Sequence, residues 1–166
     1  FQKRPTFKTV RRIVLLSRIA LLTLAAPACL FLVGCTNASV KHYEQGIVAA
    51  RNGQHDQALA AYTKAIEINP DFALAYYDRG NAYSAKREYD NAIRDFSQVL
   101  EINPALGKAY LARATAYIAK SEHDHAIEDL TEVLEMEPTN AGAYFGRGLS
   151  YTSIGCHDSA IEDLTK

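Results

Sequence analysis

The sequence lacks the short motifs that mark most enzyme active sites. It contains no glycine-rich phosphate-binding loop, no serine elbow, and no histidine, cysteine and carboxylate cluster at metal-ligand spacing. Its charged residues fall mostly on helix faces that a solvated protein would expose. We therefore predict that the chain is not an enzyme and that it needs neither a cofactor nor a metal ion.

Acidic side chains are absent from residues 1–35, which contain six Lys and Arg side chains. The rest of the chain has 12 Lys and Arg against 19 Asp and Glu, so a basic leader precedes an acidic body. An acidic body repels phosphate backbones, and no basic stripe or base-stacking pattern compensates for this. We predict that nucleic acid is not a partner.

Charge of either sign is absent from residues 19–33, an apolar run with the sequence IALLTLAAPACLFLV. As a helix this run would span about 22 Å, which is short of the roughly 30 Å hydrocarbon core, and Pro27 would kink it. A basic start followed by a short apolar centre is typical of a secretory signal peptide. The pattern predicts a signal segment over residues 1–34.

The end of the apolar run, LVGC at Leu32 to Cys35, resembles the bacterial lipobox. The resemblance implies a thioether-linked diacylglyceryl group on Cys35, cleavage before this residue, and a further acyl chain on the freed amine. Two or more acyl chains hold a protein stably at a bilayer. Residues 35–38 would then be a lipidated linker, and the body would face the periplasm or the exterior in a bacterial cell envelope. Thr36 is not aspartate, which by the same resemblance favours the outer membrane.

An alternative interpretation keeps residues 13–34 uncut, as a tilted membrane anchor in which the Arg18 side chain reaches the interface. Both alternatives place the body outside the cytoplasm, because the basic residues stay inside. Cysteine is scarce, as expected for such a chain: Cys29 lies in the leader, Cys35 would be acylated, and Cys156 has no internal partner. We interpret Cys156 as a small residue of a surface turn.

The body repeats itself at a constant step, because the segments IEINP, LEINP and LEMEP end at the evenly spaced Pro70, Pro104 and Pro138. This step defines four units, of which the last is cut short: 39–72, 73–106, 107–140 and 141–166. Apolar spacings of three, four and seven within each half of a unit are helical. Each unit is therefore predicted to form two amphipathic helices.

Small residues recur at two positions of the unit and would let its two helices approach closely. Position eight is Gly46, Gly80, Ala114 and Gly148, and position twenty is Ala58, Ala92, Ala126 and Ala160. A recurring aspartate is predicted to cap the second helix, at Asp56, Asp90, Asp124 and Asp158. Each proline of the repeat lies just past the end of that helix.

This pattern resembles the tetratricopeptide repeat over residues 39–166. The resemblance implies an all-α fold, a right-handed superhelix of antiparallel helix pairs with three full repeats and a truncated fourth. The signal or anchor helix would precede it. A single unit cannot bury its apolar face, so stacking of at least three units is needed for stability. In the family, the first helix of each unit lines a concave groove.

Position seven departs from the family, in which leucine is usual. It is arginine in the last three units, and position 23 is aspartate in the same three units, whereas the first unit has Gln45 and Ala61. Arginine and aspartate therefore occur together. We predict a structural ion pair between the helices of each unit, because a buried arginine without a partner would be costly. The predicted pairs are Arg79 with Asp95, Arg113 with Asp129, and Arg147 with Asp163.

The family resemblance places positions two, five, nine and twelve of each unit on the concave side. Positions five and nine, which we predict to bind the partner, hold Tyr43, Ile47, Tyr77, Asn81, Leu111, Thr115, Phe145 and Leu149. Relatives that hold the C-terminal carboxylates of chaperones use several Lys, Arg and Asn residues here, whereas this chain offers only Asn81 and Lys108. We predict that a protein segment docks its apolar side chains in the groove, with Asn81 bonding its backbone. The alternative is that some of the rings pack against the next unit, or against C-terminal helices that are missing from this sequence.

The combined prediction is a membrane-anchored scaffold or adaptor of the bacterial cell envelope that gathers protein partners. By family resemblance it would serve a pilus, secretion or wall-remodelling complex. One alternative is a fragment of a larger protein, in which the repeats are the docking module of a downstream catalytic domain. Another is self-association through the C-terminal repeat.

Overall fold

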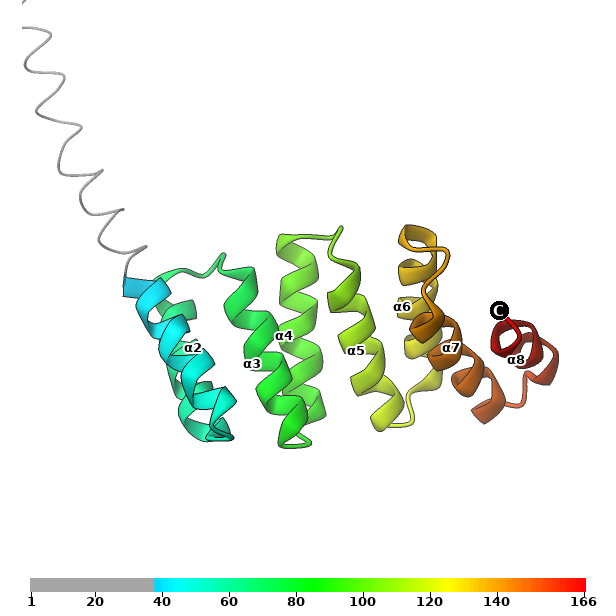
Figure 1. Cartoon of the computed structure of the whole chain (residues 1–166), viewed down its shortest axis with the longest axis horizontal. Coiled ribbons are helices and arrows are strands. Elements are labelled where there is room, and N and C mark those ends of the chain that lie inside the picture. Colours follow the sequence, from blue (N-terminus) through cyan, green and yellow to red (C-terminus); the bar gives the residue numbers. More distant parts are fainter. Residues whose placement is uncertain (1–37) are drawn as a thin grey trace, which may run out of the picture. The chain divides into compact units, whose positions relative to one another are not determined.

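The computed structural model describes residues 38–166, and within this range the chain is helical throughout, with short connections and no strand. Residues 38–51 form the first described helix. The following helices are α2 (His55–Ile68), α3 (Ala73–Ala85), α4 (Tyr89–Ile102), α5 (Gly107–Ala119), α6 (His123–Met136), α7 (Ala141–Ser153) and α8 (His157–Leu164). The predicted all-α fold is confirmed, with its helices packed as antiparallel pairs (Figure 1).

Several predictions concern residues that lie outside the described part of the chain. These are the signal segment over residues 1–34, the alternative anchor over residues 13–34, and the acylated Cys35. None of the helices within residues 38–166 is long and apolar enough to cross a bilayer.

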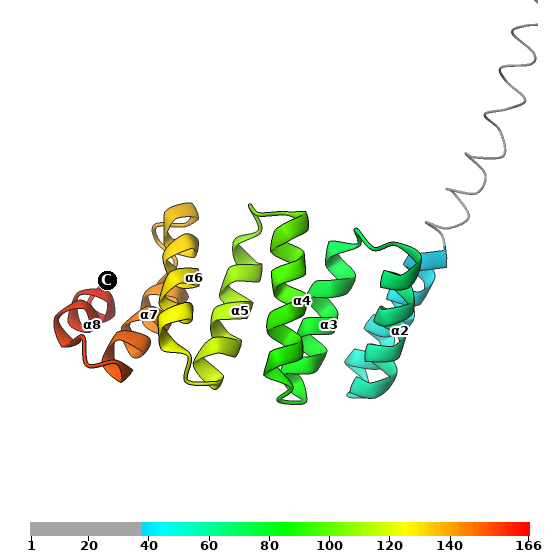
Figure 2. The ribbon, with the colours of Figure 1, turned by 180° about the vertical axis from the view of Figure 1, so that it is seen from behind.

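The described helices form two layers. Each helix packs against its neighbours in sequence, and in addition α3 contacts α5, and α5 contacts α7. The odd-numbered helices are therefore closer together than the even-numbered ones. Figure 1 looks onto the odd-numbered layer, and Figure 2 shows α2, α4 and α6 from the opposite side. Unequal spacing of two layers curves a helical stack, and the layer of shorter spacing lies on the inner face.

The two helices of a unit pack through the small residues that the repeat predicted. Ala58, Ala92 and Ala126 are completely buried. A Cβ atom added to Gly80 would lie 2.7 Å from Cε1 of Phe96, so only glycine permits this ring to approach α3. The aromatic ring fills the space that the missing side chain leaves, and Phe96 is buried. This arrangement packs α3, which belongs to the odd-numbered layer, against α4, which belongs to the even-numbered layer.

The connection inside each unit contains one residue in the left-handed region of φ, always at position 15. In the first and fourth units this residue is Gly53 or Gly155, with φ of 73° and 81°. In the second and third units it is Arg87 or Ser121, with φ of 61° and 62°. A side chain in this conformation costs roughly 1 kcal/mol or more relative to glycine. The turn is therefore relaxed at the two ends of the stack and strained in its middle.

The predicted aspartate caps are wrong by two residues. The N-cap residues of α2, α4, α6 and α8 are Gln54, Glu88, Glu122 and Cys156, and none makes a side-chain cap hydrogen bond. The aspartates lie in the first turn instead, where a negative charge interacts favourably with the helix dipole. A side-chain cap is present on α7, where Asn140 accepts a hydrogen bond of 3.0 Å from the amide of Ala143.

Candidate functional site

The arginine at position seven lies between the two helices of its unit. Arg79 Nε donates to Asp95 Oδ2 at 2.7 Å, and its Nη2 donates to Asp95 Oδ1 at 2.8 Å. Both aspartate oxygens are therefore used by a single guanidinium group, which is the strong bidentate geometry. The structure brings the other two predicted pairs together in the same way, Arg113 with Asp129 and Arg147 with Asp163.

These pairs are largely withdrawn from water. Asp95, Asp129 and Asp163 are buried, whereas the arginines are partly covered. The hydrogen bond to Asp129 raises the pKa of Arg113 above its ordinary value, although burial acts in the opposite direction. The same bond to Asp163 raises the pKa of Arg147. The arginines are therefore permanently charged and held in place, which suits a structural role.

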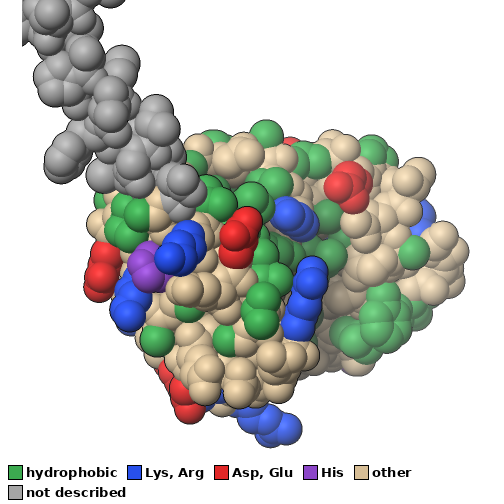
Figure 3. Space-filling model, turned by 60° about the vertical axis from the view of Figure 1, so that its left-hand side comes forward, with side chains coloured by type: hydrophobic (Ala, Val, Ile, Leu, Met, Phe, Trp, Pro, Cys, Tyr) green, Lys and Arg blue, Asp and Glu red, His purple; other side chains and the backbone are tan. Residues whose placement is uncertain are grey.

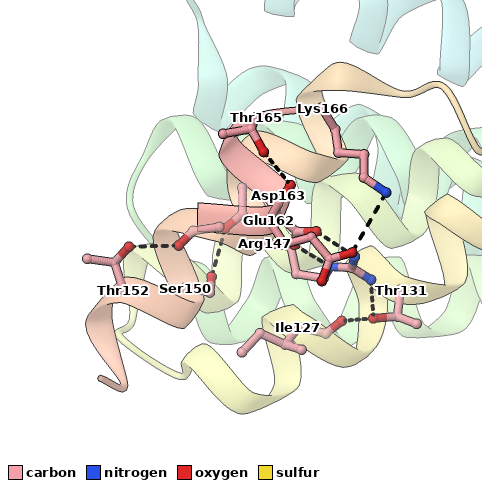
Figure 4. A network of polar contacts seen from close by, with 11 residues as sticks. Ile127, Thr131, Arg147, Ser150, Thr152, Glu162, Asp163, Thr165 and Lys166 are labelled. Carbon is pink, nitrogen blue, oxygen red and sulfur yellow. Dashed lines mark hydrogen bonds and ion pairs between the residues drawn. The ribbon is translucent and has the colours of Figure 1, made fainter. Parts of the chain in front are cut away.

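Each arginine also reaches the preceding unit, which the sequence reasoning missed. Nη1 of Arg79 donates to Thr63 Oγ1 at 3.0 Å, and Arg113 makes the equivalent bond to Ser97. The third such bond, from Arg147 to Thr131, is drawn in Figure 4. The three acceptors occupy position 25 of their units. A hydroxyl residue recurs at this position in every unit, so the signal was present in the sequence. The arginine therefore joins two helices of its own unit to the unit before it.

A second set of charges links neighbouring units near the turns. Lys86 Nζ contacts Asp56 Oδ1 at 2.7 Å and Glu88 Oε1 at 2.8 Å. Lys120 makes the equivalent contacts with Asp90 and Glu122 one unit later. The hydrogen bonds to Asp56 and Glu88 raise the pKa of Lys86. Asp56 and Asp90 are exposed and the other groups are partly exposed, so water screens these contacts and their contribution to stability is small.

The rings at position five in the first two units are partly engaged by their own chain. Tyr43 Oη donates to Asp78 Oδ2 at 2.7 Å, and its ring lies 4.9 Å from that of Phe72. Burial and the bond to Asp78 raise the pKa of Tyr43. The Tyr77 ring lies 5.7 Å from that of Phe96. Lys108 Nζ lies 4.7 Å from the centre of the Tyr77 ring, at cation–π distance.

The remaining predicted groove residues leave more of their side chains in water. Phe145 is 59% exposed and Leu149 is 43% exposed, although both are large and apolar. Asn81 and Thr115 are exposed, whereas Ile47 and Leu111 are half-buried. In Figure 3, hydrophobic side chains gather in a hollow of the surface, with Lys or Arg side chains beside it. We use the name inner surface for positions two, five and nine of α3, α5 and α7.

Metal-ligating side chains are not clustered in the described part of the chain. No group of three or more His, Cys, Asp and Glu side chains within residues 38–166 could hold a metal ion. Cys156 is exposed and unpaired in the turn before α8. What the described surface offers is apolar area with a few hydrogen-bonding groups, which is suited to binding another polypeptide.

The sequence matches three family profiles along its repeats. A TPR repeat matches residues 50–86, and two tetratricopeptide repeat profiles match residues 73–106 and 111–166. No protein of curated function matches the chain in sequence.

Many solved structures share the fold. The crystal structure of MamA has 26% sequence identity and a TM-score of 0.75, and the match covers 78% of this chain and 75% of MamA. The first TPR of Spaghetti (RPAP3), bound to the HSP90 peptide SRMEEVD, has 25% identity and a TM-score of 0.69, covering 72% of this chain and 94% of that one. The Arabidopsis OM64 TPR domain has 28% identity and a TM-score of 0.67, covering 71% and 98%. The profiles, the fold and the repeat period agree, and the chain belongs to the tetratricopeptide repeat family.

Proposed function

We propose that this protein is a membrane-anchored scaffold of a bacterial cell envelope, which binds partner proteins through apolar segments on its inner surface. Tetratricopeptide repeats are protein-interaction modules, and the Spaghetti repeat carries a bound peptide. The observation that carries the proposal is the exposure of large apolar side chains on the inner surface, Leu74 at 46%, Leu149 at 43% and Phe145 at 59%. Exposed apolar area of this kind commonly marks an interaction surface.

The chemistry of the inner surface favours an apolar partner segment. The peptide held by Spaghetti, SRMEEVD, ends in acidic residues. Here the inner surface offers Lys108 as its one cation among positions two, five and nine of α3, α5 and α7, and this cation lies over the Tyr77 ring. A single cation is insufficient to hold a cluster of carboxylates. Asn81 and Thr115 supply hydrogen-bonding groups for the backbone of the partner.

Binding on the inner surface is tested with Leu74→Ala combined with Leu149→Ala. We expect this variant to lose partners that the unchanged chain retains in crosslinked envelope extracts, because the loss of two anchor side chains costs at least about tenfold in affinity. Val48→Ala is the matched control, because Val48 is 59% exposed on the first described helix and lies at position ten, outside the inner surface. Equal partner recovery by both variants would contradict the proposal.

The membrane anchor is tested separately, by mass spectrometry of the mature N-terminus. We expect a chain that begins at Cys35 and carries the mass of a diacylglyceryl group and an acyl chain. Cys35→Ala is expected to remain uncleaved and unmodified. An uncleaved, unmodified N-terminus in the unchanged protein would contradict the lipid anchor. Binding at the inner surface is tested independently, by the Leu74→Ala and Leu149→Ala variant.

A further inference from the structure

The chain between the proposed membrane anchor and the repeats is very short. The lipid would be attached at Cys35, and helix 38–51 begins three residues later. Three residues span at most about 11 Å when fully extended. With this anchor, the start of helix 38–51 is held within roughly that distance of the lipid headgroups. The alternative anchor over residues 13–34 sets nearly the same limit, because it ends only one residue earlier.

The start of helix 38–51 lies on one edge of the stack, together with the starts of α3 and α5 (Figures 1 and 2). The turns inside the units lie on the opposite edge. We use the name anchor edge for the first turns of helix 38–51, α3, α5 and α7, with the connections and helix ends that precede the last three: residues 38–41, 65–76, 99–110 and 133–144. In the first two units, the anchor edge is held close to the bilayer.

The charge of the anchor edge does not suit a bilayer surface. Its two cations are Lys41 and Lys108, and Lys108 lies over the Tyr77 ring. Five carboxylates are exposed on the same edge, those of Glu67, Asp71, Glu101, Glu135 and Glu137. Anionic lipids attract clusters of lysine and arginine and repel an excess of carboxylates. The edge is therefore better suited to contact a protein that leaves the bilayer than to rest on the lipid.

Two large apolar side chains are exposed on the anchor edge of the first two units. Val40 and Leu74 occupy position two of helix 38–51 and α3, and they are 42% and 46% exposed. These helices are neighbours, because the Tyr43 ring lies 4.9 Å from the Phe72 ring that precedes α3. One helix spacing of about 10 Å places Leu74 within roughly 20–25 Å of the headgroups. An extended segment crosses that distance in about six to eight residues.

The inner side of α3 changes from apolar to polar with distance from the anchor edge. Positions two, five, nine and twelve are Leu74, Tyr77, Asn81 and Ser84. A helix rises 1.5 Å per residue, so Ser84 is about 15 Å farther along α3 than Leu74. A chain that leaves a bilayer changes in the same order, since apolar and aromatic residues at the interface precede polar ones in water. The order of residues on α3 therefore matches a segment that arrives from the bilayer.

We propose that the partner on the inner surface is a segment of a membrane-embedded protein, namely the residues directly beyond its span in the same bilayer. The apolar residues next to the span pack against Val40 and Leu74, and the backbone that follows bonds to Asn81. This inference rests on the proposed membrane anchor and inner-surface binding, and it adds the class of partner. Anchoring both proteins in one bilayer raises their effective concentration, which compensates for the few polar contacts that the inner surface offers.

The test uses photocrosslinking in intact membranes. Leu74 is replaced by benzoylphenylalanine in the full anchored chain, and mass spectrometry of the digested adducts identifies the crosslinked residues. A second chain also has 24 Gly and Ser residues inserted between Thr36 and Asn37, which add an r.m.s. distance of about 27 Å. A two-residue insertion at the same point is the matched control, because it adds at most about 7 Å.

We expect adducts on protein residues within about ten positions of a membrane span. The long insertion should lower their yield at least about fivefold, and the short insertion should leave it unchanged. Equal yields with the long and short insertions would overturn the proposal, as would the absence of adducts. Adducts with lipid alone would overturn it too, because the anchor edge would then rest on the bilayer.

Failure of this inference can be distinguished from failure of the proposed function. Adducts confined to proteins without a membrane span would overturn the class of partner, although binding at the inner surface would stand. If the inner surface binds no partner at all, the variant with Leu74→Ala and Leu149→Ala retains every partner of the unchanged chain, whatever the length of the insertion.

Discussion

The first unit and the three units that follow fold into the same helical hairpin, although their polar contacts differ. In units two to four, the arginine bonds an aspartate of its own unit and a hydroxyl of the preceding one. Unit one has Gln45 and Ala61 at the same positions, yet helix 38–51 and α2 form as the other helices do. The comparison teaches that the arginine–aspartate pair is dispensable for making a hairpin. It holds one hairpin to the next, because its third hydrogen bond is the one that crosses the boundary.

The largest effect is expected where this pair is broken in the middle of the stack. Asp129→Ala leaves the Arg113 guanidinium partly buried without its partner, which should lower the free energy of unfolding by about 3 kcal/mol. The double variant Arg113→Gln with Asp129→Ala copies unit one and should be less destabilised than the single variant, because no unpaired charge remains. Urea unfolding followed by circular dichroism measures both. Equal loss in the two variants would show that the pair itself, and not the unpaired charge, sets the stability.

Two glycines differ in how closely a neighbouring side chain approaches them, and replacing each by alanine tests the close contact between α3 and α4. Gly80→Ala places a Cβ atom 2.7 Å from the buried Phe96 ring and should lower the free energy of unfolding by about 1–3 kcal/mol. Gly107→Ala is the matched control, since the nearest neighbouring atom to a Cβ there is 3.5 Å away, on Glu137. The control should be neutral or slightly stabilising, because alanine favours a helix. Thermal unfolding of the two variants gives the comparison directly.

The turns differ between the middle and the ends of the stack, and exchanging their residues tests the strain. Arg87→Gly and Ser121→Gly relieve a positive φ and should each raise stability, by up to about 1 kcal/mol. Gly155→Ser makes the opposite change in the fourth unit, where φ is 81° and no atom is close, and it should lower stability by a similar amount. Differential scanning calorimetry measures the shifts. A stabilising Gly155→Ser would contradict the strain argument.

The smallest effect concerns the exposed lysine contacts. Lys86 lowers the pKa of Asp56 below its ordinary value of 3.8, so this contact stabilises the fold at neutral pH. The stabilisation is lost as the pH falls through the lowered pKa, because the carboxyl is then protonated. Asp56→Asn should therefore reduce the thermal midpoint slightly at neutral pH and leave it unchanged in strongly acidic solution. Asp124→Asn is the control, since position 14 of the next unit is Ile154 and no lysine of the described residues pairs with Asp124.

Much of the fold could be predicted from the sequence, because the same residue types recur at the same positions in four units. The glycines and alanines at positions eight and twenty, and the prolines after the second helices, predicted the hairpins correctly. The caps were misplaced because aspartate is favourable both at the N-cap and in the first turn, so its presence cannot distinguish the two. The position of Glu88 and Glu122 at the caps depends on where the preceding turn ends.

The candidate site was predicted less completely, because exposure depends on neighbouring units. Tyr43 and Phe145 occupy the same repeat position, yet Tyr43 is half-buried against Phe72 and bonds Asp78, whereas Phe145 is 59% exposed. Periodicity assigns both residues to one face and cannot indicate which of them another side chain will reach. The hydroxyl residues at position 25 differ from these rings. Their recurrence is visible in the sequence, but their role as hydrogen-bond acceptors for the arginine of the next unit was not predicted.

By itself, the amino-acid sequence determined the helices, the repeat unit and the pairing of each arginine with an aspartate, because local periodicity and charge pairing act within one unit. Only the tertiary structure decided which unit supplies the third partner of each arginine, and which apolar side chains remain open to another polypeptide. The physical reason is that a side chain is covered only when a neighbouring unit packs against it at a defined distance and orientation. Stacking sets that distance and orientation, and no single repeat encodes them.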